Sequence, residues 1–165
     1  MKKLNVLLIL IFLTLLVGCN NAKSDGTTVW RFVHEENNGS IQDVYVKEFA
    51  KKIEEKSNGK IDVEIYTVGQ IGDATQQCEL LQNGAVDFAI ISPGNTGTIV
   101  PENQLFSLHF LFTDDMNTNT KILNESEALN IDLTNEYLDN NIKVLSLKET
   151  RRQSALWTSG LPKIL

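Results

Sequence analysis

Apolar and polar residues follow different patterns in three successive parts of this chain. Residues 4–17 form an almost uninterrupted apolar run, in which only Asn5 and Thr14 are polar. Residues 20–28 are polar and show no apolar periodicity. From residue 29 onward, short alternating runs typical of β-strands are interspersed with stretches of helical spacing. The chain therefore predicts a leader, a tether and one folded domain.

The apolar run is too short to span a bilayer, which takes roughly 20 apolar residues. It follows the basic start Met1-Lys2-Lys3 and ends in Leu16-Val17-Gly18-Cys19. That order is typical of a bacterial lipoprotein signal, in which the cysteine thiol receives a diacylglyceryl group. We therefore expect residues 1–18 to be a signal peptide and Cys19 to be the lipid-modified first residue. The alternatives are an ordinary signal peptide with an incidental cysteine, or a transmembrane anchor.

A lipid on Cys19 would bury acyl chains in the membrane, with each CH₂ contributing on the order of 0.8 kcal/mol. The polar residues that follow would then be a flexible tether, so residues 19–28 are predicted to join the lipid to the domain. The domain itself is expected outside the cytoplasm, in the periplasm or at the cell surface.

The first half of the domain predicts a strand, a helix and a second strand. Residues 29–34 alternate and are rich in β-formers. Ser40 is placed to cap a helix, with Asp43 in capping-box position and Gly59 as the stop. Residues 60–66 alternate again. The helix is expected to bury one apolar face, formed by Ile41, Val44, Tyr45, Phe49 and Ile53.

The second half continues the alternation of helix and strand. Asp73 and Gln76 predict a second helix start, and residues 85–91 form a short apolar run that suits a buried parallel strand. Residues 92–104 are expected to be a loop and residues 105–112 an apolar segment, in the core or between lobes. Helices are predicted over 114–123 and 126–138, and a strand over 142–147. The βαβαβ order predicts an α/β fold with a mostly parallel sheet flanked by helices.

Charge and cysteine content narrow the function classes. The formal net charge is −6, and it becomes −8 without Lys2 and Lys3. An acidic domain argues against nucleic-acid binding, which needs a basic surface. If Cys19 is acylated, Cys78 has no partner for a disulfide and is expected to be a small buried side chain.

Candidate binding residues follow from the predicted sheet. Ligands of open α/β sheets bind beyond the carboxyl ends of the strands. The loops over 35–40 and 92–96 fall there, and they offer Glu35, Asn38 and Ser92 as polar groups. His34 lacks the spacing of a metal motif, and Ser92 lacks the pattern of a nucleophile turn. We therefore expect a binding site without a catalytic pair, a metal or a cofactor, and not an enzyme.

Several segments, in this order and spacing, resemble the solute-binding proteins of TRAP-type transporters, the DctP-type family. They are the strand with His34, and then Phe49-Ala50-Lys51-Lys52-Ile53, Ser57-Asn58-Gly59-Lys60-Ile61, Gly69-Gln70-Ile71-Gly72, Asn83-Gly84-Ala85-Val86-Asp87-Phe88, Leu108-His109-Phe110-Leu111-Phe112-Thr113-Asp114 and Val144-Leu145. The resemblance implies a two-lobed, periplasmic-binding-protein-like fold that closes on a small organic anion such as a carboxylate. It also implies membrane permease subunits as partners.

The resemblance bears on the last residues as well. Members of the family bind their ligand with arginines near and within the second lobe, so Arg152 and Trp157 become candidate contacts. Arg151 and Arg152 could equally be surface charges, and Trp157 could equally anchor the hinge. Glu35 stands where some members have a neutral polar residue, and would repel an anion unless it faces a hydroxyl or an amine.

The resemblance also sets the expected domain limits. The family is roughly twice this long, because each lobe needs about 100–150 residues. We therefore expect residues 29–148 to be the first lobe and residues 149–165 the truncated start of the hinge and second lobe. The alternatives are a ligand-sensing lipoprotein that serves a receptor, a fragment without function, and an exported hydrolase.

Overall fold

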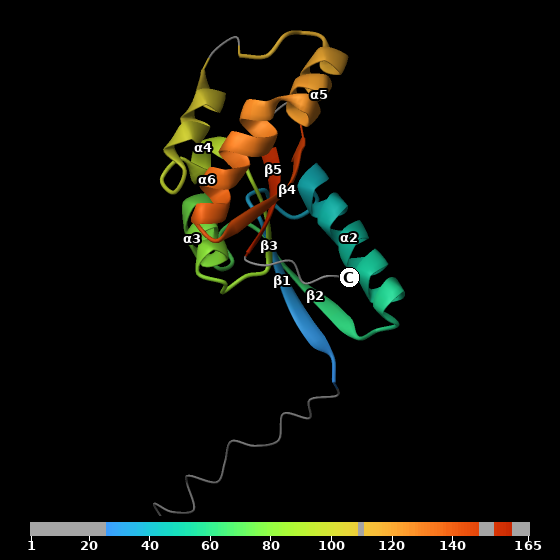
Figure 1. Cartoon of the computed structure of the whole chain (residues 1–165). Coiled ribbons are helices and arrows are strands. Elements are labelled where there is room, and N and C mark those ends of the chain that lie inside the picture. Colours follow the sequence, from blue (N-terminus) through green and yellow to red (C-terminus); the bar gives the residue numbers. More distant parts are fainter. Residues whose placement is uncertain (1–25, 109–110, 149–153, 160–165) are drawn as a thin grey trace, which may run out of the picture.

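The protein is described by a computed structural model that covers residues 26–108, 111–148 and 154–159, with the backbone alone at 148 and 154–159. Helices and strands alternate along the chain (Figure 1). In chain order they are β1 (Thr28–His34), α2 (Ile41–Ser57), β2 (Ile61–Tyr66), α3 (Ala74–Gln82), β3 (Phe88–Ile91), α4 (Pro93–Thr96), the 3₁₀ helix η1 (Pro101–Ser107), α5 (Met116–Glu125), the π-helical η2 (Ala128–Asp132), α6 (Leu133–Asp139), β4 (Ile142–Lys148) and β5 (Ser154–Ser159).

The strands form one five-stranded sheet in the order β2-β1-β3-β5-β4. β1 pairs in parallel with both β2 and β3. β5 is antiparallel to β3 and to β4, so β4 runs in the same direction as the first three strands. The predicted α/β class with a mostly parallel sheet is confirmed. The backbone of residues 154–159, predicted to begin the hinge, pairs within this same sheet.

Helices cover both faces of the sheet, with α2 on one face and α3, α4 and α6 on the other (Figure 1). The alternation of side chains along β1 divides the core accordingly. Phe32 packs with Val46 of α2 in a small aromatic cluster. Its neighbour Val33 belongs to the larger aliphatic core, which includes Leu81 of α3 and Tyr137 of α6.

Capping determines where the first two long helices begin. Ser40 accepts a hydrogen bond from the backbone N–H of Asp43 at 3.2 Å, which confirms it as the cap of α2. Asp73 and Gln76 form a complete capping box at the start of α3, with both hydrogen bonds at 2.9 Å. α2 ends where Asn58 adopts a left-handed conformation, just before the predicted Gly59.

The predicted buried face of α2 is wrong in its first half. Ile41, Val44 and Tyr45 are 85%, 56% and 47% exposed, whereas Asp43, Val46 and Ile53 are buried. Steps of four residues advance 40° around a helix of 3.6 residues per turn, so a row that runs from residue 41 to 53 at that spacing drifts by about 120°. The sheet selects the half of the helix that carries Val46 and Ile53.

Smaller differences lie in the second half of the chain. β3 is shorter than predicted, because residues 85–87 form a turn before it. The predicted loop over 92–104 contains α4 and most of η1. Residues 126–138 are largely helical, as predicted, but divide into η2 and α6. Among the described residues, no helix is both long and apolar enough to cross a membrane.

Candidate functional site

Three loops meet where the parallel strands β1, β2 and β3 end. The loop after β1 lies between the other two. The backbone N–H of Glu35 donates to the carbonyl of Ile90 in β3 at 3.3 Å, and the carbonyl of Glu36 accepts from Val68, beyond β2, at 3.4 Å. This edge of the sheet is where open α/β folds bind their ligands.

Glu35 and Ser92, predicted as site residues from separate loops, lie in direct contact. The Ser92 hydroxyl donates to one carboxylate oxygen of Glu35, and the amide of Asn95 donates to the other at 2.8 Å. All three side chains are half-buried. The structure thus presents an oriented carboxylate at the edge of the sheet. Asn95 was not predicted, although its place three residues after Ser92 in the same loop was a usable signal.

Among the described residues, the Ser92 hydroxyl donates to a carboxylate and not to an imidazole. A serine nucleophile is usually activated by a histidine that takes its proton. His34 belongs to the opposite face of the sheet, where it lies beside Asp43 of α2. The contact described for Ser92 therefore orients Glu35.

A buried hydrogen-bonded cluster of Thr96, Tyr137 and Asn103 packs against the segment that carries Ser92. The Thr96 hydroxyl lies 2.5 Å from the hydroxyl of Tyr137 and accepts from the amide of Asn103 at 2.5 Å. Burial raises the pKa of Tyr137, so this phenol stays protonated. The cluster links α4 to α6 and η1, which fixes α4 against the core.

Asn38 lies in the loop after β1, at the carboxyl edge of the sheet. It is exposed, and its side-chain oxygen accepts a hydrogen bond from the Lys47 ammonium at 2.9 Å. Asn38 is therefore oriented by α2, whereas Glu35 is oriented by the loop after β3. The role of Asn38 in ligand binding stays a prediction.

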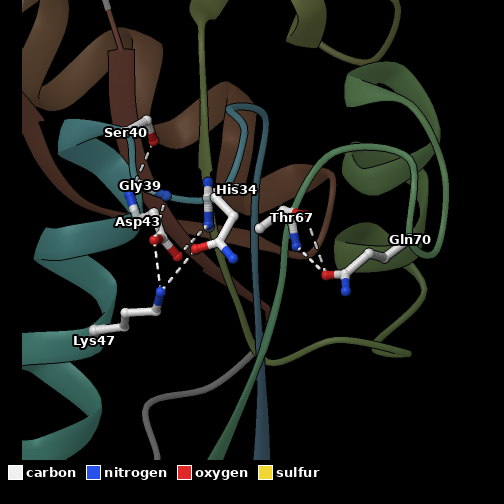
Figure 2. Close-up of polar contacts among 8 residues, drawn as sticks. His34, Gly39, Ser40, Asp43, Lys47, Thr67 and Gln70 are labelled. Atoms are coloured by element: carbon white, nitrogen blue, oxygen red, sulfur yellow. Dashed lines mark hydrogen bonds and ion pairs between the residues drawn. The ribbon is translucent and has the colours of Figure 1, made fainter.

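A polar network with a buried centre lies under the loop that follows β1 (Figure 2). The carboxylate of Asp43 accepts from the backbone N–H of Gly39 at 2.7 Å and from Lys47 at 2.7 Å. The hydrogen bond from Lys47, followed by that from Gly39, lowers the pKa of Asp43. The imidazole of His34 is fully buried, with Nε2 3.5 Å from Asp43. Burial lowers the pKa of His34, and the nearby Asp43 carboxylate offsets only part of that effect.

The turn between β2 and α3 is held in one conformation by its own hydrogen bonds and by a glycine. The N–H of Gly69 donates to the carbonyl of Gly72 at 2.9 Å, and the Gln70 side chain accepts from the N–H of Thr67 at 2.6 Å (Figure 2). Gly72 has φ +143°, and a Cβ there would lie 2.8 Å from the Cβ of Gln76. A side chain is therefore excluded at position 72 while the capping box of α3 is closed.

Three predicted residues are not placed by these contacts. Cys19 and Arg152 lie outside the described residues, and Trp157 is described by its backbone alone, which pairs with Ala89 and Val144. Within the described part of the chain, no group of three His, Cys, Asp or Glu side chains could bind a metal ion. Cys78 is buried, as predicted, and burial raises the pKa of its thiol to about 12.

A mostly parallel sheet with an oriented carboxylate and polar loops at its carboxyl edge is the kind of site at which open α/β folds bind ligands. The chain belongs to the bacterial extracellular solute-binding proteins, family 7 (DctP), which match it over residues 32–154. This family comprises solute-binding proteins, and the resemblance found in the sequence is thereby confirmed.

Individual relatives extend well beyond the match. The chain is 33% identical over 118 residues to the ectoine-binding periplasmic protein TeaA of Halomonas elongata, covering 72% of this chain and 34% of TeaA. It is 31% identical over 136 residues to the C4-dicarboxylate-binding protein DctB of Bacillus subtilis, covering 82% of this chain and 35% of DctB. The chain thus spans about a third of the length of these relatives.

The fold agrees with a solved structure from the same group. The periplasmic ectoine-binding protein of the TeaABC TRAP transporter of Halomonas elongata matches with a TM-score of 0.64 and 32% sequence identity. The match covers 72% of this chain and 38% of that structure. The single α/β lobe described above is therefore one part of a longer architecture in that protein.

Proposed function

We propose that this chain is the first lobe of the extracytoplasmic solute-binding component of a TRAP-type transporter, which captures a small organic acid for membrane permease subunits. Membership of the family supports the binding role. The observation that carries the proposal is the contact of Glu35 with Ser92 and Asn95 at the carboxyl edge of the sheet. It places an oriented polar group where this class of fold binds ligands.

The chemistry of Glu35 narrows the ligand. A carboxylate repels a purely anionic ligand at close range, but it accepts hydrogen bonds from a hydroxyl, an amine or an amidine. Both of its oxygens already accept one hydrogen bond and retain further lone pairs. We therefore propose an organic acid that also carries such a donor. Ectoine, which TeaA binds, has both a carboxylate and N–H donors.

A single lobe supplies only part of such a site. In a two-lobed binding protein, ligand contacts from both lobes form only when the lobes close, and these contacts drive closure. We therefore expect the present chain to bind weakly or not at all, and a two-lobed protein that contains it to bind tightly.

The proposal is tested by calorimetric titration with ectoine and with succinate. Two proteins are titrated: this chain from residue 19, and the longest product of the same gene. The longer protein is expected to bind ectoine, and Glu35→Gln to weaken that binding about tenfold through loss of a charge-assisted hydrogen bond. Glu48→Gln, at an exposed glutamate of α2, is the matched control.

Two results would contradict the proposal. One is the absence of binding by the longer protein across a wide panel of carboxylates, sugar acids and amino acids. The other is sub-micromolar binding by the present chain alone, because half of a closing site should not reach that affinity.

The proposal includes the membrane anchor at Cys19. A tethered binding protein stays concentrated beside its permease, which raises the effective concentration of the solute it delivers. Membrane fractionation of cells that express the protein checks this point. Cys19→Ser should move the protein from the membrane to the soluble fraction, and retention of that variant in the membrane would contradict the anchor.

A further inference from the structure

Asp43 is a buried acidic residue that lies within the first turn of α2. It is 1% exposed, yet its carboxylate is ionised, because Lys47 and the Gly39 N–H lower its pKa. Removing a carboxylate from water is unfavourable unless several donors replace the lost hydration. The buried charge of Asp43 therefore needs specific hydrogen-bond donors around it.

The partners of Asp43 come from three parts of the chain: Gly39 from the loop after β1, Lys47 from α2, and His34 from the end of β1. One carboxylate oxygen accepts from the Gly39 N–H and from Lys47, both at 2.7 Å, and the other faces His34 at 3.5 Å (Figure 2). Capping of α2 does not need the carboxylate, because the Ser40 hydroxyl already accepts from the N–H of residue 43. The side chain of Asp43 is thus directed to Gly39, Lys47 and His34.

We propose that Asp43 is a positioning residue, which sets the place of Glu35 and Asn38 at the carboxyl edge of the sheet through Gly39, Lys47 and His34. The inference rests on the proposed function, since it assigns these two residues to the ligand. In this role Asp43 acts through its neighbours and does not itself contact the ligand.

Two chains of contacts connect Asp43 to the loop that carries Glu35 and Asn38. Lys47 donates to Asn38 at 2.9 Å as well as to Asp43, so one ammonium joins the buried carboxylate to the exposed amide. His34 packs beside Asp43 and directly precedes Glu35 at the end of β1.

Gly39 completes the arrangement of the loop. It has φ +85°, a left-handed conformation that favours glycine, and its N–H points to Asp43. The Asp43 carboxylate therefore holds the Gly39 end of this loop directly and is joined to Asn38 through Lys47.

The direct test is the amide resonance of Gly39 in the ¹⁵N-labelled chain, followed during an acid titration. A carboxylate acceptor displaces this resonance, so it should titrate with Asp43, at a midpoint below the ordinary aspartate value of 3.8. Lys47→Met should raise that midpoint, because it removes the cation that stabilises the ionised form. Lys51→Met, at an exposed lysine of the same helix, is the matched control and should leave the midpoint unchanged.

A second measurement at neutral pH keeps the test independent of acid stability. Asp43→Asn should accelerate hydrogen exchange of the Gly39 amide about tenfold, since it replaces a charge-assisted hydrogen bond by a neutral one. The Gly59 amide, which donates to Glu54 at the far end of α2, should not change. A Gly39 resonance that does not titrate with Asp43, or unchanged exchange in Asp43→Asn, would overturn the proposal.

The ligand measurement separates this inference from the function on which it rests. In the longer protein, Asp43→Asn should raise the dissociation constant for ectoine about tenfold at a temperature far below unfolding. If the unaltered protein binds no ligand, the proposed function fails, while the Gly39 readouts still decide whether Asp43 orients the loop. Unchanged affinity in a folded Asp43→Asn variant, with ectoine bound by the unaltered protein, would contradict its positioning role.

Discussion

The helices α2 and α3 begin with the same kind of motif, yet the two starts serve different ends. Both follow a parallel strand, and both have a capping residue with an acidic or amide side chain three residues later. At α3 the motif closes on itself, because Asp73 and Gln76 bind each other's backbone. At α2 only Ser40 caps the helix, and the carboxylate of Asp43 accepts hydrogen bonds from Gly39 and Lys47 instead.

The difference lies in burial. Gln76 is exposed, so its side chain is free to fold back onto the cap. Asp43 lies under the loop after β1, where its charge is matched by the Gly39 N–H and by Lys47. A capping sequence therefore predicts a helix start, but it does not show which partners a side chain takes when the sheet buries it.

The largest expected effect is on stability, and it separates the two motifs. Asp43→Ala leaves the Gly39 N–H without its acceptor and Lys47 with Asn38 alone, which should cost about 2–3 kcal/mol. Asp73→Ala removes a local cap and should cost about 1 kcal/mol. Urea unfolding of both variants measures the difference, and equal costs would show that Asp43 acts only as a local helix residue.

The network at α2 should make the free energy of unfolding depend on pH. Burial lowers the pKa of His34, so the unfolded chain binds a proton near the ordinary pKa of 6.5, whereas the folded chain binds it only at lower pH. The free energy of unfolding should therefore fall as the pH drops below that value, and His34→Gln should flatten the dependence. Asp43, whose pKa is lowered, loses its contribution only in the more acidic range below 3.8.

Urea titrations at several pH values check this expectation. His109 is present in both proteins, so its contribution cancels in the comparison. An identical pH dependence in the two proteins would mean that His34 takes up its proton as readily in the folded state as in the unfolded state.

The smallest effect should come from the outer face of α2. Ile41→Gln alters a side chain that is 85% exposed and should change the free energy of unfolding by no more than about 0.5 kcal/mol. Val46→Ala, one and a half turns later on the buried face, should cost about 2 kcal/mol. A large loss in Ile41→Gln would indicate that this face packs against something beyond the described residues.

Much of the fold could be predicted from local patterns. The alternation of Ile61, Val63 and Ile65 identified a strand, and the capping residues Ser40 and Asp73 marked the helix starts within one residue. These signals are local, because a strand or a helix start depends on residues that are close in sequence. The pairing of β5 between β3 and β4 carried no comparable signal, since it joins segments that are far apart in the chain.

The candidate site was predicted in part for a similar reason. Glu35 and Ser92 follow strands whose carboxyl ends meet at one edge, so their proximity followed from the topology. The sequence did not show that Ser92 and Asn95 would both donate to Glu35. It also placed Asp43 at a cap and left its contact with Gly39 unforeseen.

By itself the sequence determined the order of the elements from β1 to β3, the starts of α2 and α3, and the loops that end at the carboxyl edge. Periodicity and capping record short-range hydrogen bonding and burial, which the chain specifies residue by residue. Only the tertiary structure decided which half of α2 faces the sheet, and therefore that Ile41 is exposed while Asp43 is buried. That choice depends on the packing of Val46 against Phe32, a contact between two elements that no local pattern encodes.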